Sequence, residues 1–243
     1  MNTSISETHH AVLFALIAKE TIQLFGPLKG EVGIRKAIRQ YGNQRGKRMA
    51  MRVQANGQEL TMTNYLIYSE WQPSGFSETQ SKMEETFPDV RMRVMVCPWN
   101  NAWIECNLLQ YGRIYCQEID EALVQGFNPE LIIKMGKTLS NDGQPCEFIY
   151  SYASLVEGDS LQIIHDRRLE SQAKNIMPWD YHCGHLLHTF QEVLINEFGT
   201  KGQNAIQAAL NDFSSIFQEE TTQIILDAQE TDFNQLPEGA SHV

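Results

Sequence analysis

The sequence predicts an α+β protein in which two αα-hairpins near the chain ends pack on a small antiparallel sheet. Two observations lead to this fold class. A helical pattern near the N-terminus recurs near the C-terminus, and the stretch between the two copies holds short apolar runs of the kind that strands show. No low-complexity linker interrupts the chain, so we expect a single domain over residues 1–243, with short frayed ends at about residues 1–7 and 230–243.

The internal repeat aligns FGPLKGEVGIRKAIRQY, which starts at Phe25, with FGTKGQNAIQAALNDF, which starts at Phe198. His9 stands sixteen residues before the first segment, and His182 stands sixteen residues before the second. Each copy predicts a helix, a break at the Phe-Gly step and a second amphipathic helix. Coincidence between two amphipathic patterns is the alternative. When one residue is omitted before the second glycine, the paired positions are Gly30 and Gly202, Ile34 and Ile206, Ala37 and Ala209, Ile38 and Leu210, and Tyr41 and Phe213.

The first hairpin is expected from about Thr8 to Val53, with its break at Gly26-Pro27. After the turn signal Asn56-Gly57, the segment LTMTNYLIYSEW predicts a strand because it is rich in Thr, Tyr and Ile. Residues 89–97 predict another strand with one wet face, since valines and a methionine alternate there with two arginines.

Glycine and proline mark the ends of the later elements. Gly126 followed by Phe-Asn-Pro is typical of a helix C-terminus. The Asp142-Gly143 step is typical of a hairpin turn. The expected elements are a helical stretch over 100–127, strands over 131–139 and 146–153, an ambiguous stretch over 157–180 in which LQIIHDR is interpreted as strand or loop, and helices over about 179–197 and 201–227.

The charge and the cysteine content disfavour several classes of function. With 30 Asp and Glu against 19 Lys and Arg, the net charge of −11 makes nucleic acid and anionic membrane poor partners. The N-terminus lacks a signal-peptide pattern, and its longest apolar run, from Ala11 to Ala18, is far shorter than the roughly 20 residues of a membrane span. Five cysteines without a CxxC pair indicate free thiols in a reducing cytoplasm. We expect a cytoplasmic protein with a small-molecule substrate and leave the oligomeric state open.

Cys116 and Asp120, in YCQEIDEALVQGFNP, are the first candidates for chemistry. They stand four residues apart and share one face of the expected helix, which Ile119 and Leu123 flank. A carboxylate raises the pKa of a neighbouring thiol unless a cation or a histidine intervenes, so the pair is unusual for a core. The residues alone leave a second interpretation open, in which Cys116 is a small core residue and Asp120 is a capping or surface acid.

The strand that begins at Cys146 offers a row of aromatic side chains. Phe148, Tyr150 and Tyr152 follow at alternate positions and therefore share one face with the cysteine. Such a face suits a small planar ligand, and it equally suits ordinary packing under helices.

HCGHLLH places His182, His185 and His188 three residues apart on an expected helix, where two of the three can face one pocket. Histidine is the usual general base at neutral pH, and it can activate a thiol nucleophile. A metal site made of cysteines and histidines is the alternative, although HxxH alone is a weak zinc signal. We assign no metal ligands and expect no cofactor, while leaving a metal open.

Arg45, Arg48 and Arg52 fall partly on one face of the second helix of the first hairpin. An arginine that points inward would bind a carboxylate in a bidentate manner. Exposure to solvent is the expected alternative for at least two of the three.

Several short segments, taken in order, resemble a known family. They are YGNQRG at Tyr41, VCPW at Cys97, YCQEID at Cys116, GFNP at Gly126, GQPCEFIY around Cys146, HCGHL at His182 and FGTKG at Phe198. With them, the chain resembles the L-2-amino-thiazoline-4-carboxylic acid hydrolases from about Phe25 to Phe217. The glycine followed by the CEF strand is more distantly similar to ligand-binding domains of the 4-vinyl-reductase type.

The resemblance implies a hydrolase that opens a cyclic amidine: water adds at the carbon between ring sulfur and ring nitrogen, and N-carbamoyl-L-cysteine results. Related cyclic amidines or ureas are also compatible with it. A non-catalytic small-ligand or metal-binding sensor domain is the alternative function. The roles that the resemblance implies are a hypothesis: Cys116 attacks or orients water, Asp120 binds the protonated amidine, His182 or His185 transfers protons, Cys146, Phe148 and Tyr150 line the pocket, and Arg45 binds the substrate carboxylate.

Overall fold

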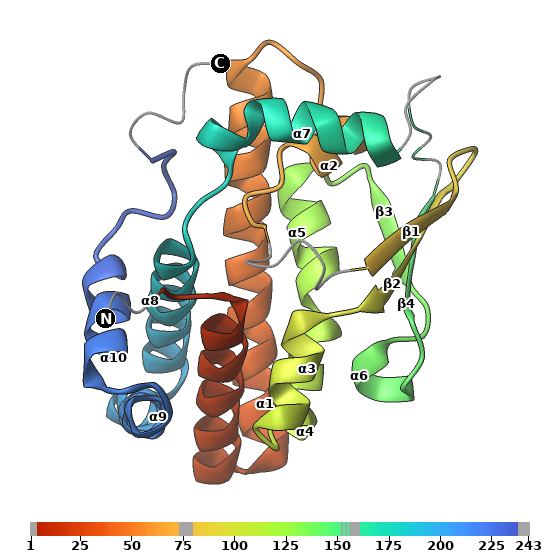
Figure 1. Cartoon of the computed structure of the whole chain (residues 1–243). Helices are drawn as coiled ribbons and strands as arrows, with labels where there is room; N and C mark the ends of the chain where they lie inside the picture. Colours follow the sequence, from red (N-terminus) through yellow and green to blue (C-terminus); the bar gives the residue numbers. More distant parts are fainter. Residues whose placement is uncertain (1–3, 73–79, 152, 154, 156–160, 238–243) are drawn as a thin grey trace. The chain divides into compact units, whose positions relative to one another are not determined.

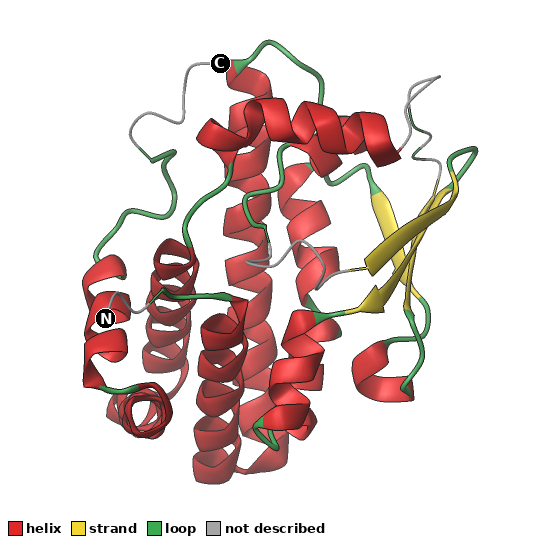
Figure 2. Ribbon diagram, viewed as in Figure 1, coloured by secondary structure: helices red, strands yellow, loops and turns green. Residues whose placement is uncertain are grey.

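The computed structural model describes residues 4–72, 80–151, 153, 155 and 161–237. Helices together with a four-stranded antiparallel sheet confirm the predicted α+β class (Figure 2). The contacts divide the chain into two compact units, each built from three separate stretches. Unit 1 comprises Met1–Tyr41, Pro98–Ile119 and Pro178–Thr231, and unit 2 comprises Gly42–Cys97, Asp120–Met177 and Asp232–Val243.

Unit 1 is helical in its described residues. α1 (Glu7–Ala55), which continues into unit 2 after Tyr41, bends at Gly26, whose φ of 81° and ψ of 162° leave the helical region. Gly199 also has a positive φ, of 59°. Glycine reaches such angles without steric strain, which explains both Phe-Gly breaks of the repeat. The other helices of unit 1 are α3 (Pro98–Glu105), α4 (Leu109–Cys116), α8 (Trp179–Phe198), α9 (Thr200–Phe217) and α10 (Glu219–Ala228) (Figure 1).

The two copies of the repeat pack alike, which confirms the repeat predicted from the sequence. A Cβ atom added to Gly30 would lie 2.7 Å from the Ile22 Cα, and one added to Gly202 would lie 2.1 Å from the Leu194 carbonyl oxygen. Each second helix therefore approaches the first helix of its own hairpin at an equivalent glycine. The paired residues of both apolar stripes are buried: Ile34, Ala37, Ile38, Tyr41, Ile206, Ala209, Leu210 and Phe213.

Unit 2 contains the sheet, in which the strands pair antiparallel in the order β1-β2-β4-β3. The strands are β1 (Gln80–Glu85), β2 (Val90–Val96), β3 (Ile132–Met135) and β4 (Cys146–Ser151). The helices are the second part of α1, α2 (Met62–Ile67), α5 (Ile119–Phe127, from Asp120 on), α6 (Leu139–Asp142) and α7 (Leu161–Asn175). A buried cluster joins α1, α2, α5 and β4 through Met49, Tyr65, Phe127 and Tyr150.

The strands β2 and β4 confirm the predictions for residues 89–97 and 146–153. The strand predicted over residues 131–139 is confirmed from Ile132 to Met135, as β3, whereas Leu139 begins helix α6. Strand β1 was not predicted. Its sequence, QSKMEE, is mostly polar and exposed, so it lacks the apolar alternation that marks a strand with one buried face. It lies at the edge of the sheet and pairs with β2.

Two secondary-structure predictions were wrong. The segment LTMTNYLIYSEW forms helix α2, because the Thr61 hydroxyl accepts a hydrogen bond from the Asn64 N–H at 3.3 Å and caps the helix start. The segment LQIIHDR opens α7, a helix of 15 residues. In both segments the short apolar run is compatible with a strand as well as with a helix. The N-cap identifies α2 as a helix, and the length of 15 residues identifies α7. Tyr152 and residues 156–160 lie outside the described residues.

The predicted helical stretch over residues 100–127 is confirmed as helical, but it divides into α3, α4 and α5. The last predicted helix likewise divides at Gln218, which has a φ of 75°, into α9 and α10. Short runs of apolar periodicity do not reveal such breaks when no glycine or proline marks them.

The chain ends are described only in part, since residues 1–3 and 238–243 lie outside the described residues. Phe233, within the stretch expected to fray, is buried in unit 2. Among the residues described, α1 alone has the length and composition of a membrane span. A buried core helix meets the same criterion, and half of the apolar window of α1 is buried.

Candidate active site

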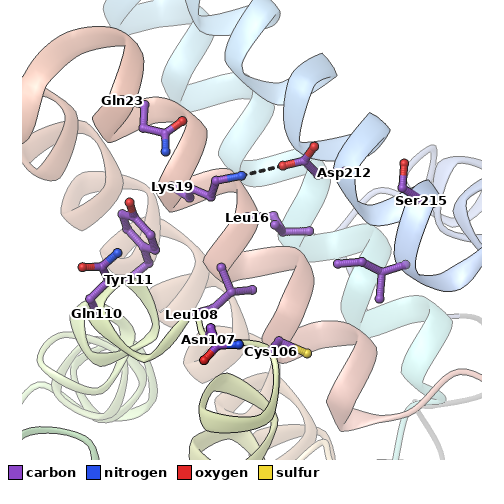
Figure 3. A pocket seen from close by; sticks show the side chains of 11 residues that line it. Leu16, Lys19, Gln23, Cys106, Asn107, Leu108, Gln110, Tyr111, Asp212 and Ser215 are labelled. Atoms are coloured by element: carbon purple, nitrogen blue, oxygen red, sulfur yellow. Dashed lines mark hydrogen bonds and ion pairs between the residues drawn. The ribbon is translucent and has the colours of Figure 1, made fainter.

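A first cavity, of about 510 Å³, lies in unit 1 between α1, α4 and α9. Lys19 and Asp212, the charged residues that line it, pair with each other at 2.7 Å from Nζ to Oδ2 (Figure 3). Burial and the neighbouring Glu105 raise the pKa of Cys106, so that thiol stays protonated and weakly nucleophilic. The residues predicted to form the site do not line this cavity, and we assign it no chemistry.

A second cavity, of about 560 Å³, lies in unit 2 and contains three of the predicted site residues: Asp120, Phe148 and Tyr150. Its size is that of a small-molecule site. We call it the Asp120 cavity. Its wall comes from α1, α2, α5, α7, three strands and the segment after α2, through Met49, Tyr65, Leu66, Ser69, Trp71, Gln72, Gln80, Ser81, Met92, Val94, Asp120, Leu123, Phe148, Tyr150, His165, Arg168 and Leu169.

The aromatic side of the cavity is built by the sheet register. Phe148 and Tyr150 alternate along β4, and Met92 on β2 stands directly opposite Phe148. Tyr65, on α2, lies with its ring centroid 6.0 Å from that of Tyr150, and the two hydroxyls form a hydrogen bond. Burial raises the pKa of both phenols above the ordinary value, so both stay protonated at neutral pH. In such a pair one hydroxyl donates its hydrogen to the oxygen of the other, and the second hydroxyl can donate its own hydrogen to a ligand.

Asp120 stands in the first turn of α5 and is partly buried at the cavity wall. Burial raises the pKa of its carboxyl from 3.8 to about 6, although the positive charge of Arg45 acts to lower it. Asp120 is therefore mostly ionised at neutral pH. A single ionised carboxylate in a largely apolar cavity attracts a cationic ligand, because burying the charge without a partner is unfavourable.

Two glycines hold α5 close to α1 and so position Asp120. A Cβ atom on Gly46 would lie 2.1 Å from the Leu123 carbonyl oxygen, and one on Gly126 would lie 2.3 Å from the Asn43 carbonyl oxygen. Both glycines belong to segments that carry the family resemblance, YGNQRG and GFNP. Because neither residue has a side chain, α5 and α1 can cross closely, and this crossing positions Asp120.

Arg45, Arg48 and Arg52 of α1 are all buried, which corrects the expectation that at least two of these three face solvent. They converge on Glu70. Arg48 forms a bidentate pair with Glu70 at 2.9 Å for each contact, Arg52 donates to it at 2.6 Å, and Arg45 lies 3.7 Å away. Burial acts to raise the pKa of Glu70, but the arginines outweigh it and hold the pKa well below its usual range. Arg45 thus faces a carboxylate of the protein and does not line the Asp120 cavity.

Cys146 begins β4 and is buried, and it does not line the Asp120 cavity. Its sulfur accepts a hydrogen bond from the Leu139 N–H at 3.4 Å. Burial raises the pKa of its thiol, as do the charges of Asp120 and Asp142, while the bond from Leu139 lowers it. The thiol is therefore protonated at neutral pH.

The remaining predicted residues, Cys116, His182 and His185, belong to unit 1. Cys116 is the last residue of α4 and is partly exposed. The Gln117 and Glu118 N–H groups bond to the Ile114 and Tyr115 carbonyls, three residues back, and this tight turn separates α4 from α5. The assumption that Cys116 and Asp120 share one face of one continuous helix was therefore wrong.

His182 and His185 are buried in an aromatic cluster of unit 1. The ring of His185 lies 4.5 Å from that of Tyr41, and the ring of His182 lies 5.3 Å from that of Trp179. His10 belongs to the same cluster: its Nδ1 accepts from the Trp99 indole at 3.1 Å, and its Nε2 lies 2.9 Å from the Tyr41 hydroxyl. Because Nδ1 is an acceptor, His10 is neutral and donates through Nε2. The sequence reasoning did not single out His10.

The sequence reasoning also missed His165 and Arg168, which line the Asp120 cavity from α7. Arg168 donates through Nη2 to the Trp71 carbonyl oxygen. Burial lowers the pKa of its guanidinium to about 10, so it remains a cation at neutral pH. The two residues stand three apart and share a helix face, a signal that becomes visible only once LQIIHDRR is recognised as helical.

A metal site was left open at the level of sequence. Within residues 4–72, 80–151, 153, 155 and 161–237, no group of three or more His, Cys, Asp or Glu side chains is placed to hold a metal ion.

Comparison with known proteins gives one match. A protein-family model described as L-2-amino-thiazoline-4-carboxylic acid hydrolase matches residues 6–150, a range that includes Tyr65, Asp120 and Phe148 and ends at Tyr150. No curated protein and no solved structure matches the chain. His165 and Arg168 lie beyond the matched range.

Proposed function

Since the chain belongs to the L-2-amino-thiazoline-4-carboxylic acid hydrolase family, we propose that it opens the ring of a small cyclic amidine in the Asp120 cavity. Substrates of this class include 2-amino-thiazoline-4-carboxylate and related five-membered amidines or ureas. The observation that carries the proposal is Asp120: one carboxylate, ionised at neutral pH, in the wall of a small cavity with aromatic sides.

Asp120 suits an amidinium for a geometric reason. A protonated amidine is planar, and its N–H bonds point in parallel, so they match the two oxygens of one carboxylate. Phe148 and Tyr150 offer flat surfaces for the ring. The bound amidinium also has an electron-poor carbon between its nitrogens, and this is the atom that water must attack.

The proposed reaction adds water to that carbon and breaks its bond to the ring sulfur. The oxygen of water forms the new carbon–oxygen bond, and the tetrahedral adduct collapses to a urea. The sulfur departs as a thiolate and takes up a proton. The protonated pair of Tyr65 and Tyr150 supplies a hydrogen-bond donor to the oxygen of the adduct, which is the usual means of stabilising such a species.

The reaction also needs a nucleophile and a proton carrier. Cys116 remains the candidate that attacks directly or orients water, and His182 and His185 remain candidates for proton transfer. His165 is a further candidate base, because it lines the same cavity as Asp120. An unprotonated imidazole nitrogen can accept a proton from water.

A panel of five-membered amidine and urea rings, assayed for release of free thiol or urea, tests the proposal with the full chain. We expect the wild type to open at least one amidine ring, and Asp120→Asn to lose most of this activity. Glu121→Gln, which changes the exposed acid next to Asp120, is the matched control and should keep the wild-type rate. Failure of the wild type to open any ring of the panel overturns the proposal.

A further inference from the structure

We infer that the substrate of the Asp120 cavity is a cyclic amidine with an apolar substituent on its ring, such as an alkyl chain. The inference rests on the proposed function for the amidine, and it adds the part of the substrate that lies away from Asp120. Two features of the cavity carry it, which are its size and the aliphatic side chains in its wall.

The cavity is larger than a bare five-membered ring requires. A 2-amino-thiazoline ring with its carboxylate fills roughly 200 Å³ at the packing density of protein interiors. The cavity measures about 560 Å³. Such a ring would leave more than half of the space to water, and much of the wall would not contact the ligand. A substituent on the ring would fill the remaining space.

Aliphatic side chains from α1, α2, β2, α5 and α7 line the cavity, and they are Met49, Leu66, Met92, Val94, Leu123 and Leu169. Several of them keep contact with water. Leu66, Met92 and Val94 are half-buried, and Leu169, on α7, is 43% exposed. Apolar surface that stays wet in a cavity is stabilised when an apolar ligand covers it. The wall therefore favours a ligand with a sizeable apolar part.

The aliphatic side chains lie beside the residues proposed to hold the amidine. Leu123 follows Asp120 by three residues on α5, so the two share one face of that helix. Met92 pairs with Phe148 across β2 and β4, and Val94 lies two residues further along the same face of β2. A ring whose amidinium pairs with Asp120 therefore has aliphatic side chains next to it, and a substituent can extend along them.

The ring carbon bonded to sulfur is the position for this substituent. The N–H bonds of the amidinium, which pair with Asp120, point away from that carbon, so a chain there does not compete for the carboxylate. The chain takes no part in the bond changes. Water adds to the carbon between the nitrogens, the bond from this carbon to sulfur breaks, and the product is a urea whose thiol end carries the chain.

The rate should depend on the length of the chain. Each fully buried CH₂ group favours binding by up to about four-fold, which is the fold-change for its transfer out of water. Because part of the wall stays open to solvent, we expect kcat/KM to rise by about 100-fold from 5-methyl- to 5-hexyl-2-amino-2-thiazoline. The bare ring, 2-amino-2-thiazoline, should be the poorest substrate of the series.

The test measures kcat/KM for the methyl, butyl and hexyl rings on the wild type and on variants of the wall. Met92→Gln puts an amide of similar size where the chain should lie, so it should lower kcat/KM for the hexyl ring by about 10-fold and change that for the methyl ring little. Met95→Gln is the matched control, because Met95 lies on the same strand, is 46% exposed and does not line the cavity. It should keep the full rise.

Leu169→Gln is a second variant of the wall, and it decides the matter if Met92→Gln does not fold. The side chain of Leu169 is exposed, so the substitution should leave the fold intact. It should also lower kcat/KM for the hexyl ring more than for the methyl ring. If the rise with chain length is the same in the wall variants as in the wild type, the inference is overturned.

Calorimetric binding of open-chain amidinium ions separates this inference from the proposed function, because these ions have no ring to open. Affinity should rise from acetamidinium to hexanamidinium in the wild type and rise less in Met92→Gln. If it does so and no ring is opened, the proposed function fails, and the apolar recognition stands. If rings are opened but neither affinity nor kcat/KM rises with chain length, the inference is overturned while the proposed function stands.

Discussion

Arg48 and Glu70 form a bidentate ion pair with both N···O distances at 2.9 Å, and neither side chain is exposed to solvent. Arg52 and Arg45 contact the same carboxylate, and the Arg48 Nη1 also donates to the Phe233 carbonyl oxygen at 2.5 Å. One buried carboxylate thus holds three buried arginines of α1 together in unit 2. Loss of Glu70 would therefore remove the carboxylate that these three arginines share.

Glu70→Gln should destabilise the protein by about 3–5 kcal/mol, because it leaves buried arginines without their carboxylate. The free energy of unfolding in urea measures this. Glu147→Gln, which breaks the partly exposed pair with Arg93 at 3.0 Å, is the control and should change stability by less than about 1 kcal/mol. Since the arginines hold the pKa of Glu70 below its ordinary value, its contribution is present above about pH 4.5 and is lost as the pH falls further. Equal effects of the two substitutions at neutral pH would show that the arginine cluster does not depend on Glu70.

Asp120→Asn should have the opposite effect on stability. Burial raises the pKa of Asp120 from 3.8 to about 6, so the folded state binds the proton more tightly than the unfolded state does. Its favourable contribution is complete below about pH 4 and is lost as the pH rises through about 6. At pH 8 the asparagine variant should be more stable than the wild type by roughly 2–3 kcal/mol, with the difference vanishing in acid. A variant that is less stable than the wild type at pH 8 would contradict this assignment.

The pH dependence of ligand binding should report the same carboxyl. The amidinium pairs with Asp120 only when the carboxylate is ionised, so affinity for 2-amino-2-thiazoline should rise as the pH passes through about 6 and level off above it. Calorimetric titrations of the wild type at a series of pH values measure the rise. Asp120→Asn should bind weakly without this rise. The same rise in the variant would mean that another group controls binding.

The fold class was predictable because its signals are local in the sequence. The repeat is carried by glycine positions and by an apolar stripe, and both act within one hairpin: Gly26 and Gly199 make the breaks, and Gly30 and Gly202 admit the close approach. The helices α2 and α7 were not predicted, because their short apolar runs suit either structure. For α2, the deciding feature is the N-cap hydrogen bond to the Thr61 side chain, which is seen only in the structure.

The candidate site was predictable in part. Asp120, Phe148 and Tyr150 were chosen from residue chemistry and resemblance, and they line one cavity. The partner of Arg45, Arg48 and Arg52 could not be chosen, since Glu70 reaches them only through the fold of unit 2. Arg168 was missed for a related reason: its place in the cavity wall depends on α7 being a helix and on the position of that helix at the cavity.

Gly126→Ala should damage both stability and activity. A Cβ atom there would lie 2.3 Å from the Asn43 carbonyl oxygen and 2.8 Å from the Asn43 Cα, and this backbone cannot give way as a flexible side chain does. The helix α5 must then move away from α1, and Asp120 moves with it. We expect a loss of more than about 2 kcal/mol in the free energy of unfolding and a lower kcat/KM in the folded fraction. Gly57→Ala, which has open space and only an unfavourable φ of 67°, is the control and should lower stability by about 1 kcal/mol with kcat/KM unchanged. If Gly126→Ala keeps the wild-type kcat/KM, the close crossing of α5 and α1 is not needed for activity.

Cys116→Ser tests whether the thiol attacks the ring carbon. If it does, its sulfur bonds to that carbon as the ring carbon–sulfur bond breaks, and the adduct has the mass of the protein plus the intact substrate. Direct attack predicts this adduct in rapidly quenched wild type by mass spectrometry, and a fall in kcat of about 100-fold or more in the serine variant, since a hydroxyl is a far weaker nucleophile at neutral pH than a thiol. Cys106→Ser is the matched control, because that cysteine is also partly exposed just after a helix of unit 1, and the raised pKa of its thiol makes it unreactive. A serine variant of Cys116 with the full rate and a wild type without adduct would assign the attack to water and leave Cys116 outside the chemistry.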